Sequence, residues 1–157
     1  TVREAREVFA ARRVIERGIV ETFLEAAPAA EIRRLQEHVD REEKAWREQD
    51  RRTMLKLSGD FHVLVAEAAG NHILTGMLRD LVSRSSLIIA VYQSPTSTPC
   101  PPDAHRELTA LLKRRDPAAV DAMIEHIEHV MADLRLEQQR PAAVDLHSVF
   151  AAAPATP

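Results

Sequence analysis

Cysteine, glycine and aromatic residues are scarce in this sequence of 157 residues, and neither sign of charge dominates. The single cysteine, Cys100, excludes an internal disulfide and fits a reducing compartment. The formal net charge of −3 gives no general attraction to nucleic acid. The longest apolar run, residues 87–92, is far shorter than the roughly 20 residues of a membrane-spanning helix, and no signal-peptide pattern opens the chain. We therefore expect a cytoplasmic protein that does not enter a membrane.

The residues that the sequence does contain favour helix. Ala, Leu, Glu and Arg dominate, hydrophobic residues make up 45% and charged residues 29%, and apolar side chains recur at helical spacing. There is no period-two pattern typical of a half-buried strand, and there is no internal repeat. The sequence therefore predicts an all-α, bundle-like domain of six helices. The expected helices cover residues 2–26, 29–49, 51–69, 72–92, 104–115 and 117–138.

Several residues mark the ends of these helices. Asp50 and Asn71 are of the types that cap helix N-termini, so we expect them to begin the third and fourth helices. Gly70 is a typical stop for the third helix. Asp103 and Asp116 are expected to cap the fifth and sixth helices in the same way.

The remaining segments define the extent of the domain. The fourth expected helix, residues 72–92, is apolar nearly all round towards its end, so it should be the most buried helix. The Pro-, Ser- and Thr-rich residues 93–102 predict a loop. Residues 1–140 are expected to form one domain, and the Ala- and Pro-rich residues 141–157 a C-terminal tail.

Three histidines, His62, His105 and His126, lie on different expected helices beside apolar residues. A bundle can bring three such imidazoles to one point, and neutral imidazole is the commonest metal ligand. A zinc ion held by three protein ligands keeps a fourth position open. The residue one turn before His62 shares its face, but it is Ser58, a poor ligand for a divalent ion. From the residues alone, a structural role for each histidine is the commoner outcome.

Two arginines stand in apolar surroundings. Arg12 follows two alanines, and Arg84 interrupts the apolar fourth helix. A buried arginine needs an anionic partner, whereas Arg84 could also extend its charged end to the surface. No Gly-rich phosphate loop and no His-Glu-x-x-His motif is present. Glu67 is the only carboxylate near His62 that could act as a general base.

Four short stretches occur in an order that resembles the FCD domain, the C-terminal effector-binding domain of the FadR subfamily of GntR transcriptional regulators. They are residues 12–16 (RRVIE), residues 61–71 (FHVLVAEAAGN), residues 105–108 (HREL) followed by Arg115-Asp116, and residues 123–126 (MIEH). The likeness covers about residues 3–138. Each stretch is weak alone, and the ordered set is fairly specific.

The resemblance implies an antiparallel bundle of six to seven helices with a central cavity for a small organic acid, often beside a divalent metal such as zinc or nickel. It implies His62, His105 and His126 as metal ligands. Ser58 stands where metal-bearing members of the family carry an Asp or Asn. The resemblance also implies effector contacts from four residues: Arg12, Arg84, Ser58 and Asn71.

The resemblance further implies a homodimeric regulator rather than an enzyme. DNA would be bound only by a winged helix-turn-helix domain that normally precedes this one and is not in this chain, which starts at Thr1. An effector that favours one arrangement of the helices would alter the spacing of the two DNA-reading domains. Two alternatives are a metal-dependent hydrolase, in which the histidine-bound metal activates water, and a ligand-free dimerisation module with structural histidines.

Overall fold

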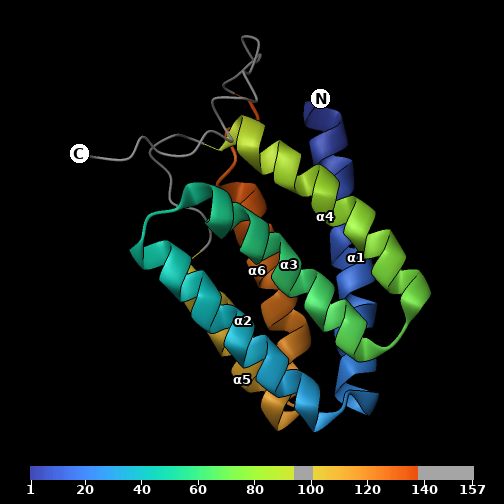
Figure 1. The fold of residues 1–157 in the computed structure, drawn as a ribbon. Helices are drawn as coiled ribbons and strands as arrows, with labels where there is room; N and C mark the ends of the chain where they lie inside the picture. Colours follow the sequence, from blue (N-terminus) through green and yellow to red (C-terminus); the bar gives the residue numbers. More distant parts are fainter. Residues whose placement is uncertain (94–100, 138–157) are drawn as a thin grey trace.

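The computed structural model describes residues 1–93 and 101–137, which form six α-helices (Figure 1). No strand occurs in these residues, and a single isolated bridge joins Gln93 to Leu134. The predicted all-α bundle is confirmed, while the loop residues 94–100 and the tail 141–157 lie outside the described residues. The helices are α1 (Val2–Ala26), α2 (Ala29–Arg47), α3 (Arg51–Ala69), α4 (His72–Tyr92), α5 (Pro102–Arg114) and α6 (Ala118–Ala132).

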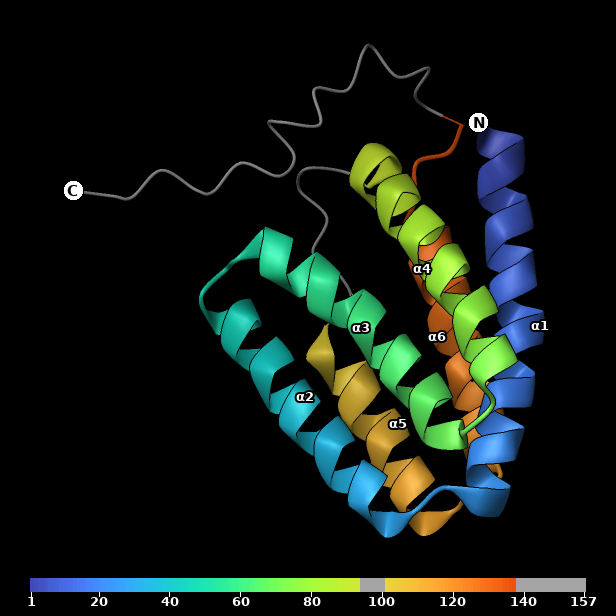
Figure 2. The ribbon, with the colours of Figure 1, turned by 45° about the vertical axis from the view of Figure 1, so that its right-hand side comes forward.

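Five helices form a closed ring of packed neighbours, in the order α1, α3, α2, α5, α6 and back to α1. The helix α4 packs outside this ring, against α1 and α3. Figures 1 and 2 show α2 and α5 on one side of the molecule and α1 and α4 on the other, with α3 and α6 between them. A side chain that points inward from any of the five helices can therefore meet partners from the others. Large apolar side chains fill most of the interior, including Phe9, Phe23, Phe61, Leu108 and Ile127.

The residues that were expected to begin and end helices do so at both ends of α3. The Asp50 carboxylate accepts a hydrogen bond from the backbone N–H of Thr53 and begins α3. The Asn71 side chain accepts two backbone N–H groups of the first turn of α4. Gly70 ends α3 with φ of 79°, in the left-handed region where a side chain would be strained. All three predictions are confirmed.

The predicted ends of the last two helices are wrong in part. The helix α5 begins at Pro102, whose fixed φ suits a first helical position, so Asp103 lies in the first turn and is not the cap. The helix α6 begins at Ala118 rather than at 117, so Pro117 and not Asp116 occupies the cap position, although the Asp116 carboxylate accepts the backbone N–H of Ala118. The helix α6 ends at Ala132 rather than at 138, because the chain after it turns to pair with the end of α4 through the bridge to Gln93.

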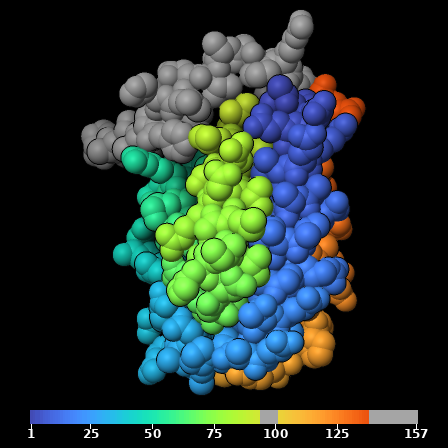
Figure 3. All heavy atoms as spheres, turned by 90° about the vertical axis from the view of Figure 1, so that its right-hand side faces the viewer, coloured from blue at the N-terminus to red at the C-terminus, as the bar shows by residue number. Residues whose placement is uncertain are grey.

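The expectation that α4 is the most buried helix is also wrong. Because α4 packs on the ring from outside, only one stripe of its surface is covered. Every large apolar side chain that is strongly exposed in the described residues belongs to α4 or α1, which lie side by side in Figure 3. We call these residues the α1–α4 surface: Val14 (73% exposed), Ile73 (73%), Met77 (53%) and Leu87 (49%). None of the six described helices combines the length and the hydropathy that crossing a bilayer requires.

Candidate functional site

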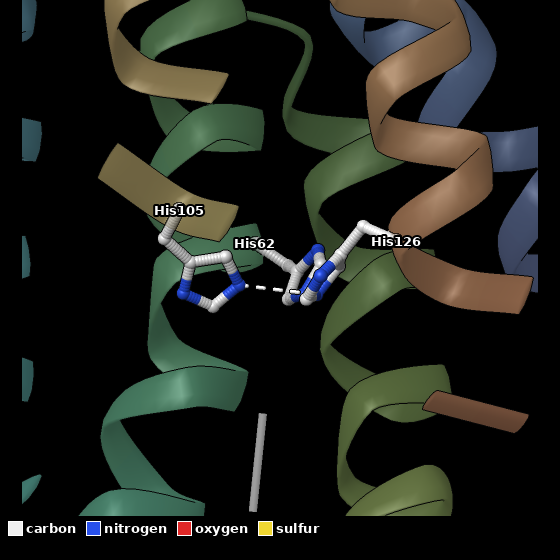
Figure 4. A group of neighbouring side chains, drawn as sticks. All are labelled: His62, His105 and His126. Carbon is white, nitrogen blue, oxygen red and sulfur yellow. Dashed lines mark hydrogen bonds between the residues drawn. The ribbon is translucent and has the colours of Figure 1, made fainter. Parts of the chain in front are cut away.

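The three candidate histidines meet inside the ring, from α3, α5 and α6 (Figure 4). One ring nitrogen of each lies within 4.8 Å of the corresponding nitrogens of the other two. The Nε2 atoms of His105 and His126 are 3.1 Å apart and share a hydrogen bond. His62 and His105 are buried, and His126 is 9% exposed. The convergence of imidazoles that the sequence suggested is therefore present in the structure.

Two buried carboxylates hold two of these rings in place. Glu16 Oε2 on α1 lies 2.5 Å from His62 Nδ1, and Glu42 Oε2 on α2 lies 2.9 Å from His105 Nδ1. A carboxylate can only accept, so each Nδ1–H donates and each Nε2 keeps its lone pair for the centre of the cluster. Hydrogen bonds of this kind fix the tautomer and orientation of histidine ligands in metal sites.

Aromatic and backbone contacts further restrain the α2 and α5 side of the cluster. The ring of Phe61 stacks on that of His105, with centroids 4.1 Å apart and an interplanar angle of 9°. His38 Nε2 donates to the carbonyl oxygen of Leu57 at 2.8 Å and also lies 3.4 Å from Glu42 Oε1, while Arg41 donates to His38 Nδ1 at 2.9 Å. Because both nitrogens of His38 are engaged in this way, it supports the fold and is not a fourth imidazole of the cluster.

Arg12 brings a buried positive charge to the opposite side of the cluster. Its Nε donates to Glu16 Oε1 at 2.7 Å, and its Nη1 donates to Ser85 Oγ at 3.1 Å. The third nitrogen, Nη2, is buried and has no hydrogen-bond partner among the described residues. The residue is only 4% exposed, and an unsatisfied buried donor of this kind costs free energy. A hydrogen-bond acceptor that reached Nη2 would remove this cost.

A small cavity connects Arg12 with the histidines. Its volume is about 20 Å³, close to the space that a single water molecule requires. His105 contributes to the cluster but does not line this cavity. The polar side chains that do line it are Arg12, Ser58, His62, Ser85, Ser86 and His126.

A wider groove of about 390 Å³ runs between α3 and α4 and adjoins the cavity. Leu55, Gly59 and Ser86 line both spaces. A Cβ atom at Gly59 would lie 2.9 Å from Val82 Cγ1, so the missing side chain is what lets α3 and α4 approach this closely. The cavity and the groove thus share part of their walls.

Three residues singled out from the sequence are not brought into this site. The side chain of Arg84 is 53% exposed and pairs with Asp80 at 2.9 Å on the uncovered side of α4. Of the two alternatives that the sequence leaves open for Arg84, the structure therefore shows the one at the surface. Asn71 caps α4 and does not line the cavity. Glu67 forms ion pairs at the surface, one of them with Arg34, and is not placed to act as a base at the histidines.

Sequence reasoning gave Glu16 and Glu42 no role, although a signal for each was present. Glu42 lies three residues after Val39, on the apolar face of a helix that is otherwise highly charged. Glu16 lies at helical spacing between Arg12 and the buried Ile19. An acidic residue at a core position of an amphipathic helix predicts a buried, partnered carboxylate.

Both carboxylates are held in the ionised form. Burial alone would raise the pKa of Glu16, but the charges and hydrogen bonds of Arg12 and His62 outweigh it and lower that pKa to about 2. Burial likewise opposes ionisation of Glu42, and hydrogen bonds from His105 and His38 outweigh it and lower its pKa below the usual value. Each carboxylate is therefore available as a hydrogen-bond acceptor at neutral pH.

Two of the imidazoles are held in the neutral form. Burial lowers the pKa of His62 to about 4, although the nearby Glu16 carboxylate opposes this shift. Burial, followed by the repulsion of His105 and His62, lowers the pKa of His126 well below its usual value. Neutral imidazole is the form that binds a metal ion, so these rings need lose no proton to do so at neutral pH.

Comparison with known protein families gives a match over most of the chain. The family model described as the FCD domain matches residues 7–129. The matched range contains the three histidines, both buried carboxylates and Arg12. Comparison with curated proteins finds no match.

The shifted histidines predict that the metal-free protein loses stability in mild acid. In the unfolded chain His62 takes up a proton near pH 6.5, whereas in the folded protein it does so only near pH 4. Because the unfolded state binds more protons between these values, the free energy of unfolding falls as the pH falls through this window. The slope reaches about 1.4 kcal/mol per pH unit for each such histidine. Urea unfolding between pH 7.5 and 4.5, with a chelator present, measures it.

The exposed His129 provides the control for this prediction, since it lies one turn from His126 on α6. His126→Phe should reduce the slope, and His129→Phe should change it much less, because burial is the first cause of the lowered pKa of His126 and the charge of His129 only adds to it. A free energy of unfolding that stays level between pH 6.5 and 5 would contradict the buried, neutral state of these rings.

Proposed function

Because the chain belongs to the FCD domain family, we propose that it is the ligand-sensing and dimerisation domain of a bacterial GntR-type transcriptional regulator, and that its cavity binds a small carboxylate effector. The observation that carries this proposal is the unpartnered Nη2 of Arg12, buried beside the histidines. A guanidinium pairs with a carboxylate through short, charge-assisted hydrogen bonds. The hydroxyls of Ser58 and Ser86 line the same cavity and can donate to further oxygens of the ligand.

We propose that the histidine cluster binds a divalent metal, with His62, His105 and His126 as ligands. Zinc and nickel both suit imidazole nitrogen, and three protein ligands leave a position open for an exogenous group. Glu16 and Glu42 supply the hydrogen bonds to Nδ1 that such ligands usually have. A bound metal would add a Lewis acid that attracts the oxygen atoms of the effector.

Effector binding requires the helices to move. The cavity holds about one water molecule, whereas even a small organic acid is larger. The groove between α3 and α4 adjoins the cavity at Gly59, so an acid anchored at Arg12 would extend into it and separate the two helices. The helix α4 also packs on α1, which would pass the displacement to the N-terminal side of the domain. An effector that binds more tightly when α3 and α4 are separated shifts the population towards that separated arrangement.

We propose that the α1–α4 surface binds a second copy of the chain. Four large apolar side chains are exposed on these two neighbouring helices, and exposed apolar area mixed with polar residues is typical of interaction surfaces. Because α4 lies between this surface and the groove, a displacement of α4 would change the geometry of the dimer.

The geometry favours a regulator over a metal-dependent hydrolase. The described residues that line the cavity include no carboxylate that could act as a general base. Glu16 and Glu42 instead accept hydrogen bonds from the Nδ1 atoms of the histidines. The arrangement serves to hold ligands in position, as binding requires.

The role of Arg12 is tested with acetate as the probe and acetamide as its uncharged counterpart. Acetate should stabilise the protein in a thermal-shift assay and acetamide should not, because only the carboxylate satisfies the guanidinium. Arg12→Met should weaken acetate binding tenfold or more, in line with the loss of about 1.5 kcal/mol for a charged hydrogen bond. Arg84→Met, the same change at an exposed arginine, should bind acetate as the wild type does. Equal stabilisation by acetate and acetamide would show that Arg12 does not bind the carboxylate.

The metal ligands are tested by equilibrium dialysis against Zn²⁺ of protein prepared without a histidine tag. The wild type should bind about one zinc ion per chain, because three imidazoles converge. His126→Ala should weaken binding at least tenfold, and His129→Ala, a change at the exposed histidine one turn away, should not. Similar zinc binding by the two variants would place the metal elsewhere or leave the cluster purely structural.

The dimer surface is tested by sedimentation of Met77→Glu. A charge at this exposed position should convert a dimer to a monomer, because desolvating an unpaired carboxylate opposes burial in an interface. Lys113→Glu on α5, at the far side of the ring, should remain a dimer. Dimers of unchanged affinity in the Met77 variant would show that the contact lies elsewhere.

A further inference from the structure

A second cavity lies on the outside of the ring, between α2 and α5, which pack side by side (Figures 1 and 2). Its volume is about 450 Å³, within the range of roughly 300–1,000 Å³ that small-molecule sites occupy. It shares no lining residue with the central cavity beside the histidines. We call it the α2–α5 groove, and its lining includes Gln36 and Val39 of α2 and Arg106, Thr109, Lys113 and Arg114 of α5.

All the charged side chains that line this groove have the same sign. Arg106, Lys113 and Arg114 are cations, and the described residues that line the groove include no acidic side chain. The helix α2 carries acidic residues along most of its length, but it contributes only the uncharged Gln36 and Val39 to the groove. The whole chain has a formal net charge of −3, so the positive charge of the groove is a local property. Such a lining favours a ligand that carries negative charge.

Two of the three cations have donors free for a ligand. Lys113 forms no ion pair or hydrogen bond with any residue in the described part of the chain. Arg114 Nη2 lies 3.8 Å from Asp116 Oδ2, which is beyond hydrogen-bond distance. Both lie in the last turn of α5, where the helix dipole favours positive charge. An anion at this end of the groove would therefore gain hydrogen bonds without breaking an existing one.

The third cation, Arg106, is held in position by α2. Its Nε donates to Glu43 Oε1 at 2.7 Å, its Nη2 also bonds Glu43, and Nη2 lies 3.4 Å from Asp40 Oδ1. Its Nη1 has no partner among the residues that the structure describes. Arg106 lies two helical turns before Lys113, which is roughly 10 Å along the axis of α5. The groove therefore has a cation at each end.

The walls of the groove are fixed relative to each other by two adjacent ion pairs. On the inner side of α2 and α5, Glu42 Oε2 lies 2.9 Å from His105 Nδ1. On the outer side, the next residue of each helix forms the pair of Glu43 with Arg106. Val39, which lines the groove, is only 1% exposed. Because the groove is formed before a ligand arrives, binding costs little conformational entropy of the helices.

We propose that the α2–α5 groove binds a small organic phosphate. A phosphate group carries a charge of about −1.5 to −2 at neutral pH and has three acceptor oxygens, so it can bind Lys113 and Arg114 together. A carboxylate has two oxygens and one charge. Arg106 binds a second polar group of the same molecule at the other end of the groove, and the Gln36 amide donates to the part between them. The inference goes beyond the proposed function and does not depend on it.

The test is an NMR titration of the nitrogen-15-labelled, metal-free chain with sodium pyrophosphate, and with sodium chloride at equal ionic strength as the control. The backbone amide signals of Thr109, Ala110 and Lys113 should shift with pyrophosphate and reach saturation, with a Kd of about 1 mM or lower. Chloride should give small shifts that do not saturate, because the screening of surface charge involves no defined site.

Two matched lysine variants show whether the groove itself binds the anion. Lys113→Met should weaken pyrophosphate binding by about fivefold or more, the upper end of what one exposed charge contributes. Lys44→Met, the same change at an exposed lysine of α2 that does not line the groove, should stay within about twofold of the wild type. Gln36→Glu, of equal size, places a carboxylate in the groove and should abolish saturable binding. Far-ultraviolet circular dichroism checks that the variants fold.

Three results would overturn the groove site. The first is the absence of saturable shifts in the wild type. The second is saturable shifts centred on Arg12 and Ser85, which would place pyrophosphate in the central cavity. The third is equal weakening in Lys113→Met and Lys44→Met, which would reduce the effect to the overall charge of the protein. None of them bears on the proposed function, because the acetate and zinc experiments concern residues that do not line the groove.

Discussion

The hydrogen bonds between two buried carboxylates and two imidazoles determine what the centre of this fold can do. Glu16 reaches His62 from α1, and Glu42 reaches His105 from α2. Each bond joins two helices of the ring and leaves an Nε2 lone pair facing the centre. Without its imidazole partner, either carboxylate would be a buried charge with too few donors, which is strongly destabilising. The hydrogen bonds of the polar centre therefore depend on how the helices of the ring pack, and the packing depends on these bonds.

Arg12 leaves one buried hydrogen-bond donor of this centre without a partner among the described residues. It satisfies the second oxygen of Glu16 and the hydroxyl of Ser85, yet leaves one nitrogen without a partner beside a cavity of about 20 Å³. Natural cores rarely retain such a group without a reason. On the proposed function, the missing partner is an anionic ligand, and the adjoining groove between α3 and α4 would offer room for the rest of that ligand. The helix α4, which would then have to move, packs outside the ring.

Much of the fold could be predicted from the sequence because its causes are local. Asp50, Gly70 and Asn71 act within one turn of themselves, and apolar periodicity located all six helices. The burial of α4 could not be predicted, because Ile73 and Met77 differ from core residues only in what packs against them. The histidine convergence was anticipated from residue type and helical placement. The buried Glu16 and Glu42 were overlooked, since charge on an amphipathic helix usually faces water, and only the tertiary structure shows which charges do not.

Nitrogen-15 NMR of the imidazole side chains in the metal-free protein at pH 7 tests most directly which ring nitrogen of His62 and His105 carries the proton. The two nitrogens of a neutral ring have distinct shifts that identify the protonated one. The structure predicts that His62 and His105 carry the proton on Nδ1, bonded to Glu16 and Glu42, with an unprotonated Nε2. Protonation of His62 on Nε2, with Nδ1 bare, would contradict it, because the lone pair would then face the carboxylate and the cluster could not bind a metal as arranged here.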